Sequence, residues 1–191
     1  MAACQTTLFG RQNGCVFLQL PKNILEFHRT LGIPVEYCNS CNLPFCEEPD
    51  QLVATELDFY DRPQQLTPES FAAWTAMKLA AANSRVDIFL ISAYRSAQYQ
   101  ADLLAKKLSS GDAIEDILTV NAAPGFSEHH TGRAVDIGTH GCGALVEDFE
   151  NTTAFQWLKE NSADFCFTMS YPRDNAFGII YEPWHWCFDN N

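Results

Sequence analysis

Apolar side chains recur at helical spacing in two segments near the middle of the chain. The first segment predicts a helix with Thr67 as its cap and Pro68 at its first position, which ends near 83–84. The second segment predicts a helix that starts behind a Ser96 cap and stops at 110–111. The two apolar stripes consist of Phe71, Trp74, Met77 and Ala81, then of Ala97, Ala101, Leu104 and Leu108.

Shorter apolar runs predict the strands. The run at 86–91 is nearly continuous and partly β-branched, which is typical of a buried strand. The stretch at 138–150 is Gly-rich and then acidic, so we expect a surface loop there, and Asp112 is expected to cap a short helix. A strand and a loop are expected within 51–62. Further strands are expected at 133–137, 165–169 and 177–181, with a turn at 172–175, and further helices at 24–31, 112–120 and 153–162. This order predicts an α+β fold in which a largely antiparallel sheet packs against helices.

The length and composition of the chain predict a single domain over 1–191, with an irregular extension at 1–50. Hydrophobic residues make up 47% of the sequence, which favours a compact globule over disorder. The formal net charge of −12 argues against nucleic acid or an anionic membrane as a partner, because both attract clustered Lys and Arg. If the substrate is an anion, the site itself must supply positive charge. The sequence does not specify an oligomeric state.

The start of the chain lacks the basic residues and the long apolar centre of a secretory signal. No apolar run reaches the length of a membrane span, so no membrane partner is expected. We therefore expect a cytoplasmic protein, or a periplasmic or cell-wall protein if a signal is missing from this sequence. The eight cysteines are then expected to be reduced thiols.

A cluster of cysteines in the N-terminal segment raises the question of a structural metal. Cys38 and Cys41 have the spacing of half a zinc site, and Cys46, Cys15 or His28 could be further ligands. Because no second pair of Cys or His follows, we favour ordinary loop cysteines.

Two dense clusters of polar residues hold the candidate chemistry. The stretch 127–136 contains two histidines, two carboxylates and two hydroxyls, and the stretch 182–186 adds Glu, His and two Trp. His and Asp are ligands of zinc ions that keep an open coordination position. The spacing of His129 and Asp136 suits a loop ligand followed by a strand ligand, with a turn at Gly132 between them. We expect such a zinc site at the edge of the sheet.

Other residues near these clusters are given plainer interpretations. His130 is expected to be a neighbour of the ligands rather than a ligand. Glu128 and Asp102 are expected to be solvated charges. Trp74 and Trp157 have helical spacing to apolar neighbours, which is typical of the core.

The sequence resembles the VanY-type D-alanyl-D-alanine carboxypeptidases, which are zinc enzymes that trim peptidoglycan stem peptides. The resemblance covers about residues 66–188 and leaves 1–50 unexplained. It rests on the pattern Ser-x-His-x2-Gly-x-Ala-x-Asp, met by Ser127, His129, Gly132, Ala134 and Asp136, on Glu-Pro-Trp-His at 182–185, and on Tyr94, Arg95 and Ser96.

The resemblance implies roles for particular residues. His129, Asp136 and His185 would bind one zinc ion, and Glu182 would be the general base. Arg95 would anchor the substrate or stabilise the oxyanion, because its guanidinium can pair with a terminal carboxylate. The residues implied to hold the substrate's terminal residue are Gln100 and Ser127, while Trp184 is expected to wall the cleft.

The sequence therefore predicts a zinc carboxypeptidase that releases the C-terminal D-alanine from peptidoglycan peptides. The absence of a signal favours, as an alternative, an L,D-carboxypeptidase that acts on tetrapeptides in cytosolic recycling. An endopeptidase ranks lower, because Arg95 and Gln100 point to a free terminal carboxylate. A non-catalytic zinc module, as in Hedgehog signalling domains, is the alternative from another class, and Glu182 and Arg95 favour the enzyme over it.

Overall fold

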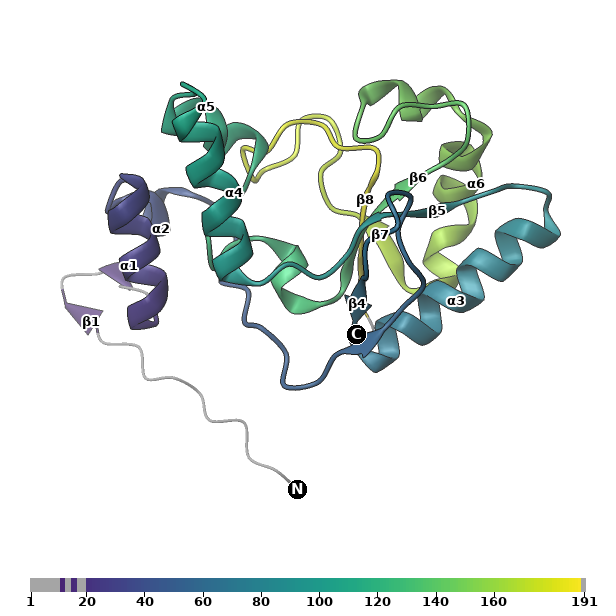
Figure 1. Ribbon diagram of the computed structural model, residues 1–191, viewed down its shortest axis with the longest axis horizontal. Helices are drawn as coiled ribbons and strands as arrows, with labels where there is room; N and C mark the ends of the chain where they lie inside the picture. The colour runs from purple at the N-terminus through teal and green to yellow at the C-terminus, as the bar shows by residue number, and fades with distance from the viewer. Residues whose placement is uncertain (1–10, 13–14, 17–19, 190–191) are drawn as a thin grey trace.

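A central antiparallel sheet with helices packed around it makes up the fold, so the predicted α+β class is confirmed (Figure 1). The computed structural model describes residues 11–12, 15–16 and 20–189. The sheet has the strand order β5-β6-β8-β7, and each neighbouring pair is antiparallel. Its strands are β5 (Phe89–Ser92), β6 (Ala134–Gly138), β7 (Phe167–Met169) and β8 (His185–Phe188).

The remaining elements are helices and two short antiparallel pairs of strands. The pairs join β1 (Arg11–Gln12) to β2 (Cys15–Val16) and β3 (Val53–Ala54) to β4 (Gln65–Leu66). The α-helices are α1 (Lys22–Leu31), α2 (Tyr37–Ser40), α3 (Pro68–Asn83), α4 (Ala97–Ser109), α5 (Ile114–Val120) and α6 (Thr153–Asn161). Short 3-10 helices lie at η1 (Glu128–Thr131), η2 (Glu147–Asn151) and η3 (Ser162–Phe165). None of the helices that the structure describes is long and apolar enough to cross a bilayer.

Two hydrophobic clusters flank the site. One joins the sheet to α3 and α6, and the other joins the helices α1, α4 and α5. Figure 1 shows these two groups on opposite sides of the molecule, with the chain before β8 looping between them. A cleft between the two groups can therefore be lined by residues from both.

The capping signals read from the sequence determine where the two long helices begin. The Thr67 side chain accepts a hydrogen bond from Ser70 N at the start of α3, and Ser96 Oγ accepts one from Tyr99 N at the start of α4. Both helices have the predicted bounds, because these caps are local interactions that need no distant partner. The α4 cap also places the residue before it, Arg95, at the end of the link from β5.

Several predicted elements were wrong in detail. The strand expected at 86–91 is shifted to β5, and the cap of α5 is Ala113 rather than Asp112. No strand forms at 177–181: β7 pairs directly with β8, and the chain between them is a loop. The expected surface loop at 138–150 ends in η2, which buries Phe149 at 1% exposure.

The described part of the N-terminal segment contacts the strand-to-helix link and the loop that surround the site. Glu48 accepts hydrogen bonds from Tyr94 Oη (2.6 Å) and Ala97 N (2.7 Å), on either side of Arg95. His28 Nε2 donates to Pro124 O (2.8 Å) in the loop before η1. The N-terminal segment, which the resemblance leaves unexplained, thus stabilises the link before α4 and the loop before η1.

Candidate active site

A tight turn connects the first candidate ligand to the second. His129 lies in η1, which ends at Gly132 with a φ of +64°, and β6 follows at once. The left-handed conformation favours glycine at this position, and a Cβ atom there would lie 2.8 Å from Leu52 Cδ2, so a larger residue would displace the Leu52 side chain. The turn brings His129 back over Asp136 in β6, as its spacing in the sequence predicted.

Strand pairing brings the third candidate to the same point. Asp136 in β6 lies opposite His185, the first residue of β8. The sequence placed His185 where a strand ends, whereas it begins one. The predicted position at the sheet edge also needs refinement, because β6 and β8 are the two inner strands of the sheet.

The three side chains are buried and their ligand atoms converge. His129, Asp136 and His185 are 1%, 3% and 2% exposed, and one ligand atom from each lies within 4.8 Å of the others. His129 Nε2 is 3.3 Å from Asp136 Oδ2, and His185 Nδ1 is 3.1 Å from Asp136 Oδ1. Among the described residues, this is the group of His, Cys, Asp and Glu that could hold a metal ion, and Cys38, Cys41 and Cys46 form no such group. The side chain of Cys15 lies outside the described residues.

The tautomer of His129 indicates that a cation fits between these atoms. His129 Nδ1 is 2.6 Å from Ala93 O, and because a carbonyl oxygen only accepts, Nδ1 carries the proton. Burial, followed by the nearby Arg95 guanidinium, lowers the pKa of His129 to about 4, so the imidazole is neutral. Its Nε2 lone pair is buried without a hydrogen-bond partner and faces a carboxylate oxygen. Two acceptors that face each other in this way fit a metal ion between them.

The charges around Asp136 also attract a cation. Burial would raise the pKa of Asp136, but the imidazoles of His129 and His185 outweigh it and lower this pKa. Burial would lower the pKa of His185, but Asp136 and Glu128 raise it to about 10. The carboxylates thus stabilise positive charge at this point in a protein whose net charge is −12.

A second carboxylate lies beside the group without belonging to it. Glu182 is 8% exposed, and its Oε2 is 3.9 Å from His185 Nδ1. Burial raises the pKa of Glu182 to about 7. A carboxylate with that pKa can both accept and return a proton near neutral pH.

Arg95 lies on the other side of Asp136. Its Nη2 is 3.6 Å from Asp136 Oδ2, and its Nε is buried without a hydrogen-bond partner. Backbone contacts hold it in place: Arg95 N donates to His129 O (3.2 Å), and His130 Nδ1 donates to Arg95 O (2.6 Å). His130, expected to be only a neighbour of the ligands, thus contacts the backbone of the arginine that lies beside Asp136.

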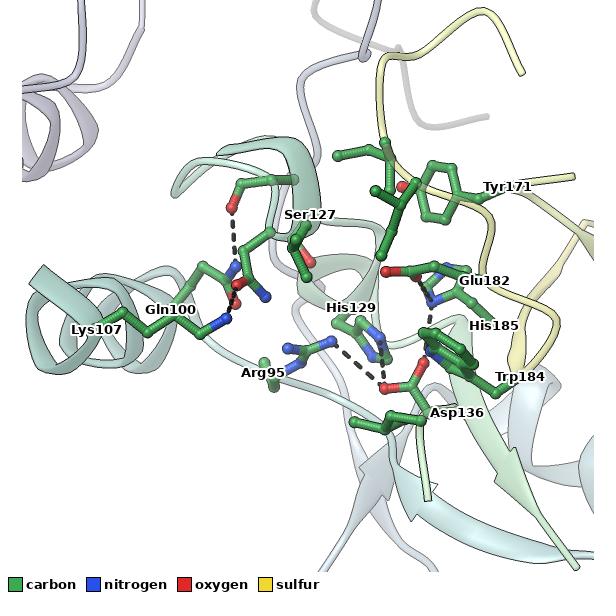
Figure 2. Close-up of a pocket in the computed structure, with 16 residues that line it drawn as sticks. Arg95, Gln100, Lys107, Ser127, His129, Asp136, Tyr171, Glu182, Trp184 and His185 are labelled. Atoms are coloured by element: carbon green, nitrogen blue, oxygen red, sulfur yellow. Dashed lines mark hydrogen bonds and ion pairs between the residues drawn. The ribbon is translucent and has the colours of Figure 1, made fainter. Parts of the chain in front are cut away.

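All eight of the sequence-predicted site residues line one cleft (Figure 2). Gln100 is 1% exposed, and its Nε2 donates to Ala122 O (2.8 Å). Its Oε1 is buried without a hydrogen-bond partner. The eight residues are Arg95, Gln100, Ser127, His129, Asp136, Glu182, Trp184 and His185.

The cleft also contains residues that the sequence did not single out. Lys107 lies two helical turns after Gln100 on α4 and donates to Asn121, so the periodicity of α4 could have indicated it. Tyr171 packs on the ring of His185 with the centroids 4.8 Å apart. Apolar side chains at the rim are Val120, Leu145 and Ile180.

The fold and the site together define a class of protein. A buried His-Asp-His group, with a carboxylate and an arginine beside it in one cleft, is the arrangement of a metal-dependent hydrolase. Residues 63–191 match the family model described as VanY, D-alanyl-D-alanine carboxypeptidase. This match covers more than half of the chain, and the chain therefore belongs to the VanY family.

Curated relatives carry related names. The putative carboxypeptidase YodJ of Bacillus subtilis (strain 168) is 29% identical over 181 residues, which are 91% of this chain and 62% of the relative. The bifunctional D-Ala-D-Ala dipeptidase and carboxypeptidase VanXYC of Enterococcus gallinarum is 30% identical over 147 residues, 74% of this chain and 75% of the relative. A D-alanyl-D-alanine carboxypeptidase of Enterococcus faecalis (strain ATCC 700802 / V583) is matched over only 38% of its length. The chain thus spans less than two thirds of some relatives that it matches.

Solved structures share the fold. The LdcB LD-carboxypeptidase aligns with a TM-score of 0.70 at 26% identity, over 94% of this chain and 83% of that one. VanYB in complex with D-alanine-D-alanine aligns with a TM-score of 0.58 at 27% identity, over 74% and 81%. A mutant of the D,D-pentapeptidase VanY in complex with Zn(II) aligns with a TM-score of 0.56 at 26% identity, over 74% and 82%.

Proposed function

We propose that this protein is a zinc-dependent carboxypeptidase that releases the C-terminal D-alanine from peptidoglycan stem peptides. The observation that carries the proposal is the buried Nε2 of His129, which has no hydrogen-bond partner and lies 3.3 Å from Asp136 Oδ2 while Nδ1 binds Ala93 O. The family match and the VanY structure in complex with Zn(II) support zinc as the ion. His129, Asp136 and His185 would hold it, and when bound it supplies the Lewis acidity that polarises a peptide carbonyl and activates water.

Glu182 is the proposed general base. Its carboxylate lies beside the ligand group and is not one of its members. It accepts the proton that water loses on attacking the scissile carbonyl, and it returns that proton to the nitrogen of the departing D-alanine. Burial favours this exchange, because it brings the pKa of Glu182 to about 7.

Arg95 is the proposed anchor for the terminal carboxylate of the peptide. Its guanidinium lies in the cleft with a buried Nε that has no hydrogen-bond partner. A carboxylate can accept two N–H bonds from such a fork, which fixes the distance of the chain end from the scissile bond. Ser127 and Gln100 line the same cleft and are proposed to contact the terminal residue, with Trp184 as a wall.

The bond that is cut separates two candidate activities. The family name and the complex of VanYB with D-alanine-D-alanine favour the D,D bond of a pentapeptide. The LdcB LD-carboxypeptidase, aligned over 94% of this chain, favours the L,D bond of a tetrapeptide as the alternative. The same alternative would suit a cytoplasmic enzyme that recycles peptidoglycan fragments.

Mass spectrometry of the products tests the proposal. Zinc-loaded protein is incubated with pentapeptide and tetrapeptide muropeptides, with Glu182→Gln as the inactive control. Loss of one D-alanine from the pentapeptide supports the D,D activity, and loss from the tetrapeptide supports the L,D activity. Internal fragments would identify an endopeptidase instead. A protein that binds zinc and leaves all these peptides intact would be a binding module, and the proposal would be wrong.

A further inference from the structure

Glu128 is a partly buried carboxylate to which the VanY pattern gives no role, since it occupies the open position between Ser127 and His129. The sequence suggested a solvated charge, and that expectation was wrong. The Glu128 side chain is 22% exposed, and its Oε2 is 2.8 Å from His185 Nε2. It also takes part in a side-chain hydrogen bond with Ser170.

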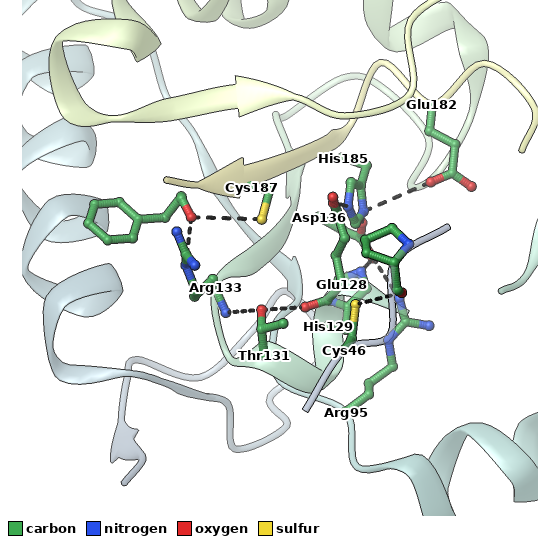
Figure 3. A network of polar contacts seen from close by, with 12 residues as sticks. Cys46, Arg95, Glu128, His129, Thr131, Arg133, Asp136, Glu182, His185 and Cys187 are labelled. Atoms are coloured by element: carbon green, nitrogen blue, oxygen red, sulfur yellow. Dashed lines mark hydrogen bonds and ion pairs between the residues drawn. The ribbon is translucent and has the colours of Figure 1, made fainter. Parts of the chain in front are cut away.

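The two nitrogens of His185 face two different carboxylates. Nδ1 is 3.1 Å from Asp136 Oδ1, and Nε2 is 2.8 Å from Glu128 Oε2 (Figure 3). When a metal ion takes the place of a proton on Nδ1, the ring keeps its one proton on Nε2 and donates it to Glu128, and the Nδ1 lone pair is directed toward the metal beside Asp136. In the other tautomer, Nε2 and Glu128 would be two acceptors at hydrogen-bond distance, which is unfavourable.

His129 shows the same arrangement with the two ring nitrogens exchanged. Its Nδ1 donates to Ala93 O, and its Nε2 lone pair faces Asp136. The two histidines would therefore approach Asp136 in opposite tautomers, each held by an acceptor on the far side of its ring. Ala93 O is a fixed backbone group, whereas Glu128 is a side chain that mutation can change.

We propose that Glu128 is a positioning residue, which accepts the Nε2 proton of His185 and thereby directs the Nδ1 lone pair toward the metal. This inference rests on the proposed function, in which His129, Asp136 and His185 bind zinc. Removing an acceptor that binds the second ring nitrogen of a metal-ligating histidine typically lowers the metal affinity by about tenfold to a hundredfold. The charge of Glu128 contributes as well, because a carboxylate makes the imidazole a more basic ligand.

Glu128 is not itself placed to bind the metal. It is absent from the group whose ligand atoms converge, and it does not line the cleft that contains Asp136. It lines a different hollow, together with Cys46, Ser170 and Cys187. The ring of His185 thus separates Glu128 from the proposed zinc position.

Zinc affinity measured by competition with a chelator tests the inference on the full chain. Glu128→Ala removes both the hydrogen bond and the charge, and we expect its zinc affinity to fall by about tenfold to a hundredfold. Glu128→Gln keeps an oxygen acceptor and should recover part of this loss. The matched control is Glu56→Ala, because Glu56 accepts hydrogen bonds from Trp74 Nε1 (2.8 Å) and Lys78 (3.0 Å) and does not line the cleft. Its zinc affinity should equal that of the wild type.

Nitrogen-15 NMR of the histidine rings gives a second readout that loss of stability would not imitate. In the zinc-loaded wild type we expect His185 to carry its proton on Nε2. This N–H should exchange slowly with solvent in the wild type, and the slow exchange should be lost in Glu128→Ala. A wild type with the proton on Nδ1 of His185 would overturn the inference.

The outcomes distinguish this inference from the proposed function. If the wild type binds zinc and hydrolyses the peptide, and Glu128→Ala and Glu128→Gln bind zinc equally well, the inference is wrong and the proposed function stands. If the wild type binds no zinc, both are wrong. If Glu128→Ala does not fold, Glu128→Gln and the NMR signal of the wild type decide the question.

Discussion

Replacing Gly132 with alanine should strain the turn between His129 and Asp136 and lower the free energy of unfolding. The φ of +64° is left-handed, and an L side chain there costs about 1–2 kcal/mol. The new Cβ would also lie 2.8 Å from Leu52 Cδ2 and 3.3 Å from Thr67 N. Leu52 can rotate away, but Thr67 N cannot move freely, because it donates to Gly132 O (2.9 Å).

The expected loss of stability is therefore larger than backbone strain alone. Overpacking typically costs about 1–3 kcal/mol, and we expect the lower half of this range because the Leu52 side chain can move. Added to the backbone strain, this gives a total loss of about 2–4 kcal/mol in the free energy of unfolding. Gly141→Ala is the matched control: its φ is +84°, and nothing lies within 4 Å of the added Cβ. That variant should lose only about 1–2 kcal/mol.

Urea unfolding of the two variants measures this difference, and chelator competition measures whether the turn also affects the metal. Gly132→Ala should bind zinc less tightly by about tenfold or more, the scale seen when a ligand is poorly held, whereas Gly141→Ala should not change. Equal losses of stability in the two variants, with equal zinc affinity, would refute the reasoning that this turn aligns His129 with Asp136.

Three further predictions concern the proposed base Glu182, the proposed anchor Arg95, and His28, which binds the loop before η1. Glu182→Gln should lower kcat by about 100- to 10,000-fold while zinc stays bound, and substantial turnover in that variant would exclude Glu182 as the base. Arg95→Lys should lower kcat/KM by about 10- to 100-fold for a peptide with a free carboxyl end. It should have little effect on the C-terminal amide, and equal losses for both would contradict the anchoring role. Burial lowers the pKa of His28 from 6.5, so the unfolded chain takes up this proton first as the pH falls. The wild type should therefore lose stability below about pH 6.5, by at most about 1.4 kcal/mol per pH unit. His28→Gln, which keeps a donor for Pro124 O, should lack this part of the loss in urea titrations at pH 7.5 and 5.5.

The parts of the fold that the sequence predicted well depend on local interactions. The caps Thr67 and Ser96 bond to backbone N–H groups three residues away, so they could be recognised without knowing the tertiary structure. The turn at Gly132 is equally local. The His-Asp-His group followed from the resemblance, and its convergence required only that β6 and β8 pair.

The errors arose where an apolar run or a charge has a distant partner. The run at 177–181 has strand-like composition, but Ile179 and Ile180 line the cleft and no strand is paired with them. Glu128 resembled a solvated charge because its partner, His185, lies 57 positions away in the sequence. Neither periodicity nor spacing contains such information, since the loop at 177–181 follows from the pairing of β7 with β8, and the contact of Glu128 with His185 follows from the pairing of β6 with β8.

The segment around Arg95 explains why a carboxypeptidase suits this site better than an endopeptidase. Arg95 N donates to His129 O, and His130 Nδ1 donates to Arg95 O, so the arginine and the first proposed ligand are joined through the backbone. Glu48 holds the same link from the N-terminal segment, through Tyr94 Oη and Ala97 N. Because the guanidinium is thereby held 3.6 Å from Asp136, a carboxylate bound to Arg95 must lie close to the proposed metal position. A terminal carboxylate bound there would place the scissile bond near the chain end, as the proposed carboxypeptidase activity requires.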